Sequence, residues 1–326
     1  MQETTHEMNS TTKKQKIKAI LIANPTSGSY TMHEHQIKQI ISTLHQHGWQ
    51  ADLKLTQAGG DARRIASEAV EQKIDVVIAI GGDGTIHEII QSLAGSETAL
   101  GVLPSGTVNV WAREVGISLD LNKASNVLLN GQTRRIDLGK IDDRYFLLMV
   151  GIGVDGEVTH AVEKKPVKRL GVIGYLLVAA WWGARYPAFR AAIALNNQVI
   201  KVHALQVIIG NTQLYGGAMK YTWEAKCDDG VLDICVIRRQ NILRRLPVLL
   251  DFLLRRPQRK QWVRYETSDT LKITTTEPVA IQVDGEPIGH TSTSEEQPTC
   301  ISVVPQALKV IVPQILPKDL FSQPPL

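Results

Sequence analysis

Residues 75–88 read DVVIAIGGDGTIHE, an apolar run that leads into a glycine-rich turn and a polar helix start. The apolar run Asp75–Ile80 is typical of a parallel strand covered on both faces. Glycines let the backbone approach a ligand without a Cβ, and the free N–H groups at a helix start attract phosphate oxygens. We therefore expect Gly81–Thr85 to bind nucleotide phosphates, although a plain strand-to-helix turn would need one of these glycines.

The same alternation of strand and helix patterns extends on both sides of this turn. Further strands are expected at Ile17–Ala23, Trp49–Leu55 and Ala99–Pro104. Helices are expected at residues 34–47, at 61–72, after Thr85 and at 108–115. This order predicts a doubly wound α/β domain with a parallel sheet and right-handed crossovers.

The pattern changes after residue 135, where short strand-like segments separated by Gly, Asn and Asp turns predict an antiparallel β-sandwich. One helical stretch, at residues 168–185, interrupts these strands. The expected organisation is a disordered tail at 1–15, an α/β nucleotide-binding domain at 16–132, a β-sandwich at 133–313 and a C-terminal tail at 314–326. That last, proline-rich stretch predicts loose packing or disorder.

Composition and charge set limits on the class of protein. A length of 326 residues fits about two domains, and 43% hydrophobic with 21% charged residues excludes a mostly disordered chain. The net charge of +4 is too small to predict nucleic-acid binding. The longest uncharged stretch, Leu170–Ala184, is shorter than the ~20 apolar residues that cross a bilayer, so we expect no transmembrane segment.

The cysteines and the N-terminal residues bear on the compartment. The 3 cysteines, Cys227, Cys235 and Cys300, lack a Cys-x-x-Cys spacing and cannot form a disulfide framework. The polar first sixteen residues show no secretory signal. A reducing cytoplasm fits these features best.

Two more polar loops follow predicted strands of the α/β domain. Asn24–Gly28 ends the first strand, and Pro104–Thr107, with Asn109, ends the fourth. Each loop alone is more often a simple turn, but their shared position indicates that three loops converge on one polyphosphate. The chain has no P-loop, and the Gly-x-Gly-x-x-Gly pattern at 151–156 lacks the βαβ context of a dinucleotide site.

Five motifs in order resemble those of the diacylglycerol kinase catalytic family, the bacterial soluble lipid kinases related to sphingosine and ceramide kinases. They are NPTSG at Asn24, GGDGT at Gly81, PSGTVN at Pro104, DDGVLD at Asp228 and VDGEP at Val283. The resemblance runs from about Lys16 to Pro313. GGDGT alone is shared with NAD kinases, whereas the other motifs in this order are more specific.

The resemblance implies an ATP site and a magnesium site. It implies that ATP is held by Asn24, Pro25, Thr26, Ser27, Gly28, Thr56, Gly81, Gly82, Asp83, Gly84, Thr85, Ile86, His87 and Thr107. It implies Mg²⁺ on the Asp229 side chain, with the Lys226 and Val231 positions supplying carbonyls, an oxygen set that suits a hard cation. Asp83 and Asp137 resemble carboxylates that reach a metal through water, but DDG can also be a plain hairpin turn.

Phosphoryl transfer needs a carboxylate that orients or deprotonates the acceptor hydroxyl. The resemblance places this base on the VDGEP turn, with Glu286 the first choice, Asp284 the second, and Asp83 a further catalytic carboxylate. The alternative is a solvated acidic turn. His87 stands where many relatives have Asn, and Val110 follows Asn109 where many have Asp; as a lone histidine, His87 is assigned no proton-transfer role.

The segment Arg238–Arg264 carries nine basic residues against one acid, Asp251, and is interleaved with apolar residues. Such a segment can lie on an anionic bilayer, where each basic residue adds about 1 kcal/mol. A solvated helix face is the alternative. In the helical stretch at 168–185, Tyr175, Trp181 and Trp182 could contact acyl chains, although such residues more often belong to a core.

These observations favour an ATP- and Mg²⁺-dependent lipid kinase, cytoplasmic and peripherally associated with the inner face of the membrane. Diacylglycerol is the default acceptor and would give phosphatidic acid; phosphatidylglycerol or a sphingoid base remains open. The alternatives are an NAD kinase and a non-catalytic module that senses nucleotide or lipid. A homodimer is left open.

Overall fold

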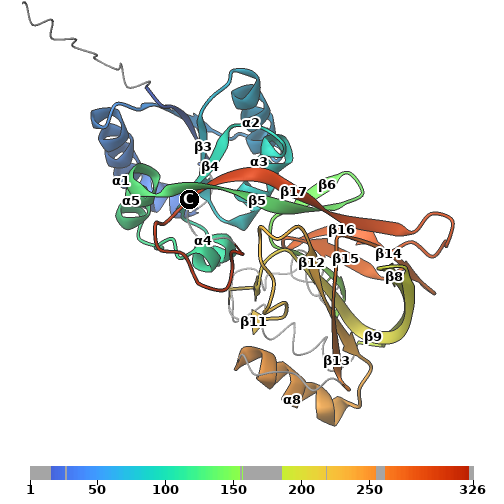
Figure 1. Cartoon of the computed structure of the whole chain (residues 1–326). Helices are drawn as coiled ribbons and strands as arrows, with labels where there is room; N and C mark the ends of the chain where they lie inside the picture. Colours follow the sequence, from blue (N-terminus) through green and yellow to red (C-terminus); the bar gives the residue numbers. More distant parts are fainter. Residues whose placement is uncertain are drawn as a thin grey trace, which may run out of the picture.

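The structure is a computed structural model that describes residues 16–25, 28–154, 156, 186–217, 219–254 and 261–322. An α/β lobe and a β-rich lobe lie side by side, with helix α8 (Ile242–Leu253) at the far end of the β-rich lobe (Figure 1). The helix expected at 168–185 and the N-terminal tail lie outside the described residues.

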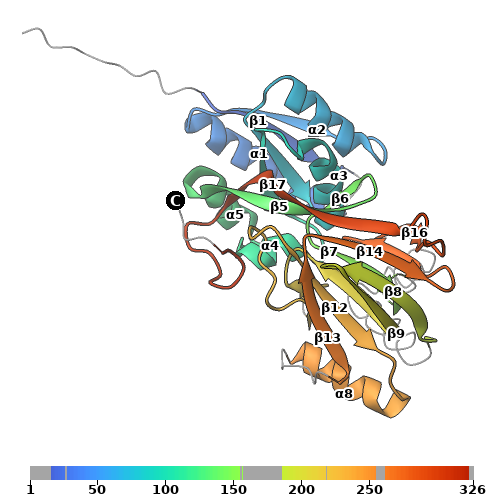
Figure 2. The same cartoon turned by 45° about the vertical axis from the view of Figure 1, so that its right-hand side comes forward.

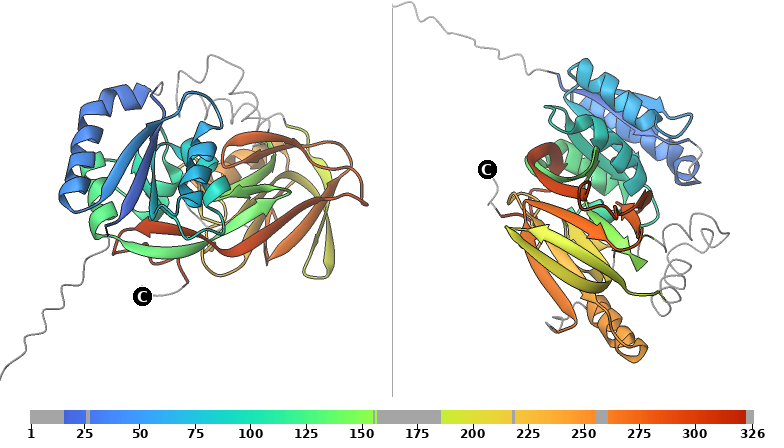
Figure 3. Two further views of the ribbon diagram at one scale, coloured as in Figure 1. Left: turned by 90° about the horizontal axis from the view of Figure 1, so that it is seen from above. Right: turned by 90° about the vertical axis from the view of Figure 1, so that its right-hand side faces the viewer.

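The α/β lobe contains the predicted parallel sheet. Its strands, in the order β2-β1-β3-β4, are β1 (Lys18–Ala23), β2 (Gln50–Leu55), β3 (Val76–Gly81) and β4 (Ala99–Pro104). Its helices are α1 (Gly28–Gln46), α2 (Asp61–Glu71), α3 (Asp83–Leu93), α4 (Val110–Val115) and α5 (Leu121–Asn130). Helices α1 and α5 contact each other on one face of the sheet, and α2 and α3 on the other (Figure 3). The doubly wound α/β fold is thus confirmed.

Continuous apolar runs place the central strands of this lobe in its core. Leu21 and Ile22 on β1 and Ile78 on β3 are fully buried. Burial of one such side chain stabilises the fold by about 1.5–3 kcal/mol, and helices on both faces leave no solvated side for polar residues.

The second lobe is the predicted antiparallel sandwich. Its larger strands are β5 (Gln132–Ile141), β6 (Arg144–Phe146), β7 (Met149–Gly153), β8 (Phe189–Leu195), β9 (Gln198–Gly210), β12 (Leu232–Arg238), β13 (Val263–Ser268), β14 (Thr270–Thr275), β15 (Ala280–Val283), β16 (Glu286–His290) and β17 (Thr299–Val312). Strands β10 (Leu214–Tyr215) and β11 (Met219–Lys220) form a small separate ladder. The first half of β9 pairs with β8, and its second half lies between β7 and β12. This long strand therefore connects β8 to the β7 and β12 side of the sheet.

Strands β5 and β17 link the two lobes as an antiparallel ribbon (Figure 2). Near its end β17 also pairs in parallel with β4, and near its start it pairs antiparallel with β14. The ribbon has a register shift between Val304 and Leu308, where Gln306 adopts a positive φ of 53°. One hydrogen-bonded sheet therefore runs through both lobes.

The chain end differs from the loose tail that the sequence predicts. Residues 318–322, the C-terminal strap, pack on the molecule, with Leu320 and Phe321 buried. Cys227 N–H donates to the Leu320 carbonyl, Ser322 N–H donates to the Asp228 carboxylate, and the Arg134 guanidinium lies 5.5 Å from the centre of the Phe321 ring. An apolar Leu–Phe pair inside the proline-rich stretch explains this anchoring.

Across the described ranges, no helix has both the length and the hydropathy that a membrane crossing needs.

Candidate active site

The glycine-rich turn and the loop after β4 form one joined structure. The Gly81 carbonyl accepts hydrogen bonds from Ser105 N–H at 3.0 Å and Gly106 N–H at 3.3 Å. A Cβ added to Gly106 would lie 2.4 Å from the Gly82 Cα, so this contact requires glycine. The predicted convergence of these two loops is therefore present in the fold.

Asp83 fastens this joined structure to helix α4. Its carboxylate accepts hydrogen bonds from Val110 N–H at 3.0 Å and Trp111 N–H at 3.3 Å. Burial raises the pKa of Asp83, and these hydrogen bonds oppose the increase. Both carboxylate oxygens thus hold the first turn of α4, which is a structural task beyond the catalytic role expected from the sequence.

A cavity of about 160 Å³ opens beside the glycine-rich turn. Its lining brings together Asn24, Thr56 and Thr85, three of the residues expected to hold the nucleotide. Glu88, which the sequence did not single out, lines the same cavity, and its carboxylate accepts the Gly60 N–H at 3.1 Å. Glu88 thereby ties α3 to the loop before α2 at the cavity mouth.

The other expected nucleotide residues occupy mixed positions. Ile86 is only 3% exposed and packs in the core, whereas Thr107 is exposed on the loop after β4. Pro25 follows Asn24 at the end of β1, and Gly28 begins α1. Thr26 and Ser27 lie outside the described residues.

The geometry separates the two acids of the VDGE turn, which the sequence could not do. Asp284 and Gly285 have φ of 50° and 89° between the paired residues Val283 and Glu286, as a two-residue hairpin requires. The Asp284 side chain is 2% exposed. Its carboxylate accepts the N–H groups of three successive residues, Leu147, Leu148 and Met149, at 2.8–3.0 Å. Asp284 therefore fixes the turn to the start of β7.

Glu286 faces the glycine-rich turn and is open to solvent. Its side chain is 44% exposed, and its Oε1 lies 3.6 Å from the position that a Cβ on Gly84 would take. Burial raises the pKa of Glu286, the nearby His87 lowers it, and Glu88 and Asp284 raise it further. A carboxylate from the β-rich lobe thus lies against the glycine-rich turn of the α/β lobe.

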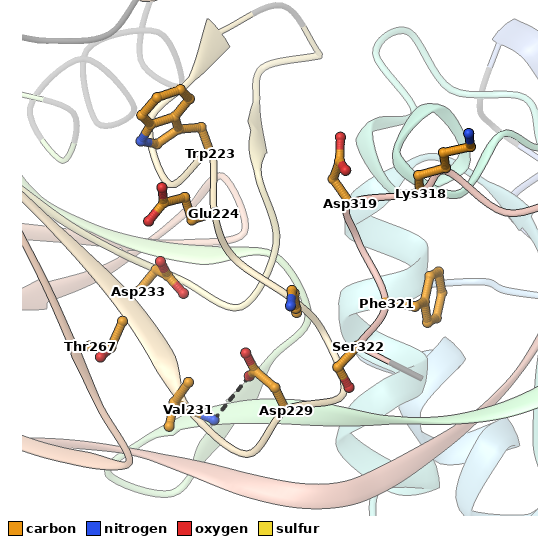
Figure 4. Close-up of a pocket in the computed structure, with 11 residues that line it drawn as sticks. Trp223, Glu224, Asp229, Val231, Asp233, Thr267, Lys318, Asp319, Phe321 and Ser322 are labelled. Atoms are coloured by element: carbon orange, nitrogen blue, oxygen red, sulfur yellow. Dashed lines mark hydrogen bonds between the residues drawn. The ribbon is translucent and has the colours of Figure 1, made fainter. Parts of the chain in front are cut away.

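The DDG turn lines a different cavity, of about 650 Å³, shown in Figure 4. Asp229 and Asp233 turn their carboxylates toward this space. Glu224, Lys226, Val231 and Asp319 of the C-terminal strap also line it. The described residues that line this cavity are all different from those that line the cavity beside the glycine-rich turn.

The donor set of the DDG turn fits a hard cation. Burial raises the pKa of Asp229, and neighbouring Asp137 and Asp228 raise it further. Burial, with the charges of Asp229 and Glu224, raises the pKa of Asp233 to about 7. A cation would relieve the repulsion among these acids. Within the described part of the chain, no three His, Cys, Asp or Glu side chains group closely enough to hold a metal, so backbone carbonyls would have to contribute.

Asp137 clamps the DDG turn to the inter-lobe ribbon. Its fully buried carboxylate accepts Gly230 N–H and Gln306 N–H, each at 2.7 Å. Burial raises the pKa of Asp137, and these two hydrogen bonds oppose the increase. Each carboxylate oxygen accepts one backbone N–H, so Asp137 holds the DDG turn against β17 in this structure.

A buried amide connects the two acidic turns and was not found from the sequence. Asn211 Nδ2 donates to the carbonyls of Asp137 and Leu147, both at 3.0 Å, and the side chain is fully inaccessible. Asp137 holds the DDG turn, and Leu147 N–H holds Asp284. The polar run at residues 211–213 directly after the apolar half of β9 is the signal that could have identified it.

Comparison with known proteins identifies the same two parts. The model described as "Diacylglycerol kinase catalytic domain" matches residues 18–141, and that described as "YegS C-terminal NAD kinase beta sandwich-like domain" matches residues 148–312. A diacylglycerol kinase of Bacillus subtilis is 29% identical over 82% of this chain and 89% of its own length. A protein of Chromohalobacter salexigens described as "Probable lipid kinase YegS-like" is 30% identical over 78% of this chain and 83% of its own length.

Solved structures support the fold. A crystal structure of a diacylglycerol kinase from Bacillus anthracis, at 23% identity, superposes with a TM-score of 0.72 over 92% of this chain and 98% of the other. A second crystal structure from that organism, at 27% identity and the same coverage, gives a TM-score of 0.77.

Proposed function

The chain belongs to the diacylglycerol kinase catalytic-domain family and carries a YegS-like C-terminal domain, and on this premise we propose that it phosphorylates the hydroxyl of diacylglycerol with ATP to give phosphatidic acid. The family membership makes it a lipid kinase that uses ATP. The choice of diacylglycerol follows its similarity to the diacylglycerol kinase of Bacillus subtilis.

One observation carries the proposal: Glu286 lies against the first turn of α3, beside Gly84. In the reaction, the acceptor oxygen forms a bond to the γ-phosphorus while the bond from that phosphorus to the β–γ bridging oxygen breaks. The hydroxyl proton passes to Glu286, and ADP leaves. Placement and charge stabilisation are the main tasks of the protein in such a transfer.

The α/β lobe supplies the placement. The start of α3 has no side-chain cap, which suits phosphate oxygens, and Asn24, Thr56 and Thr85 line the adjoining cavity. We assign the nucleotide to this side of the site, with Gly81–Gly84 against the phosphates.

We assign Mg²⁺ to the DDG turn, on the Asp229 carboxylate and the carbonyls of Lys226 and Val231. Bound there, the ion would neutralise the surrounding acids and hold the turn in one conformation. Asp137 would support this site by fixing Gly230.

Labelled ATP with Mg²⁺, offered to mixed micelles of diacylglycerol, phosphatidylglycerol and a sphingoid base in parallel with NAD, tests the acceptor. We expect label in phosphatidic acid, at least tenfold above every other acceptor. Label in another lipid would show that the acceptor is that lipid, and the protein would still be a lipid kinase. Label in NAD would make the protein an NAD kinase, and ATP binding without any transfer would make it a sensing module.

We further propose that α8 brings the protein to an anionic membrane at the inner face of the bilayer. Its Val248 and Phe252 are buried, while Pro247, Leu250 and Leu254 are exposed at a spacing that places them on one face of the helix. Basic residues flank the helix on both sides in sequence, and Arg239 just before it is exposed. An apolar stripe with nearby positive charge suits an anionic interface.

Sedimentation with vesicles of phosphatidylglycerol tests this surface. We expect binding that weakens as salt rises, because exposed charges are screened over ~8 Å at physiological ionic strength. The double substitution Leu250→Ser with Leu254→Ser should reduce the bound fraction severalfold. Ile315→Ser, at an 89% exposed apolar residue far along the chain, is the matched control and should bind normally. Vesicle binding that changes neither with salt nor with the α8 substitutions would disprove the proposal that α8 binds the membrane.

A further inference from the structure

His87 is buried between the two acids of the VDGE turn, although it comes from the other lobe. Its side chain, on α3, is 4% exposed. Nδ1 lies 3.2 Å from Asp284 Oδ2, and Nε2 lies 3.9 Å from Glu286 Oε2. The imidazole thus spans the distance between a buried carboxylate and a solvent-accessible one.

The anchoring of Asp284 decides which nitrogen of His87 carries the permanent proton. A carboxylate that already accepts three backbone N–H bonds acts as an acceptor, so Nδ1–H donates to it. The Nε2 atom is then the one that gains or loses a proton, and it points to Glu286. In the protonated form, Nε2–H attracts the Glu286 carboxylate.

Two more charged groups of the described residues act on this pair. Arg144 of β6 acts on both His87 and Glu286, and Glu88 of α3 acts on Glu286. Burial alone would lower the pKa of His87, but the hydrogen bond to Asp284 and the charges of Asp284 and Glu286 outweigh burial and raise it. The protonated form of His87 therefore persists to a higher pH than that of a free histidine.

We propose that His87 is a positioning residue that holds the Glu286 carboxylate in its reactive orientation, with Asp284 as its anchor. This rests on the proposed function, in which Glu286 is the base. An Asn at this position would be too short to reach from Asp284 to Glu286, so His87→Asn removes this link.

The pH dependence of the His87→Asn variant tests the proposal. In the wild type, kcat/KM should fall on the acid side as Glu286 gains a proton and on the alkaline side as His87 loses one. In His87→Asn, kcat/KM near neutral pH should drop about 10- to 100-fold. Its acid limb should move to higher pH, because the positive charge that lowers the pKa of Glu286 is gone, and its alkaline limb should disappear.

A merely structural role for His87 would lower the rate equally at every pH, with both limbs in place, and that result would overturn the proposal. His45→Asn is the matched control, since His45 lies on α1 with its Nε2 2.9 Å from the Ala51 carbonyl oxygen, away from both acids. It should keep the wild-type profile. ATP affinity should stay within about threefold in His87→Asn.

A second measurement does not depend on turnover. NMR titration of the imidazole signals, with the His87 signal identified by its loss in His87→Asn, should show a lower pKa for His87 in Glu286→Gln than in the wild type. An unchanged His87 titration would show that the two side chains do not interact. If Glu286→Gln keeps full turnover, the assignment of the base fails; if it loses turnover while His87→Asn keeps both limbs, only the role of His87 fails.

Discussion

Glu286→Gln is expected to lower kcat by about 10²- to 10⁴-fold, the usual contribution of a positioned general base, while ATP binding is retained. The amide keeps the shape of the side chain but cannot take the proton of the acceptor hydroxyl. The nucleotide cavity is lined by other residues, so ATP affinity, measured by calorimetry, should change little. Initial rates with diacylglycerol micelles measure the loss.

Glu296→Gln serves as the matched control, because Glu296 is an exposed acid in the loop that follows β16. Its rate should equal that of the wild type. The raised pKa of Glu286 adds a second expectation: activity should begin to fall, as pH decreases, at a higher pH than an ordinary glutamate would give. A Glu286→Gln enzyme with the wild-type rate would move the base to another group.

Asp137→Ala is expected to lower the free energy of unfolding by about 2–5 kcal/mol, since it removes a fully buried carboxylate that accepts two backbone N–H groups. The donors are Gly230 N–H at the DDG turn and Gln306 N–H at the bulge of β17. Urea denaturation followed by circular dichroism measures the change, without any added divalent cation.

Asp143→Ala, an exposed acid on the turn between β5 and β6, is the control and should unfold at the wild-type urea concentration. The experiment also distinguishes two roles for Asp137. If Asp137→Ala unfolds like the wild type but needs more Mg²⁺ for activity, the role of Asp137 is to support metal binding. A destabilised protein with unchanged Mg²⁺ dependence would confirm the anchor.

The α/β lobe could be predicted because β1, β3 and β4 are continuous apolar runs that end in polar loops, and β2 alternates apolar and polar residues. Val76–Gly81 and Ala99–Pro104 lie within two residues of the expected bounds. The sandwich was predictable as a class, but not its pairing, because alternation within a short strand says nothing about which partner it meets. The parallel contact of β17 with β4, across more than 200 residues of sequence, illustrates this limit.

The sequence motifs predicted which loops form the candidate site. They did not predict which acidic residue is structural and which faces the glycine-rich turn. Asp284 and Glu286 stand two residues apart in one turn, and only the three N–H groups from residues 147–149 show that Asp284 is an anchor. The role of Asn211 could not be predicted, because it depends on hydrogen bonds to two carbonyls far away in sequence. The histidine after the glycine-rich turn had no visible partner, since both of its partners come from the other lobe.

The ribbon of β5 and β17 restricts how the two lobes can move relative to each other. Two hydrogen-bonded strands resist bending far more than a single flexible linker does, so the lobes cannot swing apart freely. Relative movement would concentrate at the bulge around Gln306, the one break in the register of the ribbon, and Asp137 grips that point. A bulky molecule must therefore enter, and its product leave, with only small twisting of the β5–β17 ribbon. The position of Glu286 relative to the α/β lobe is then largely fixed before a ligand binds.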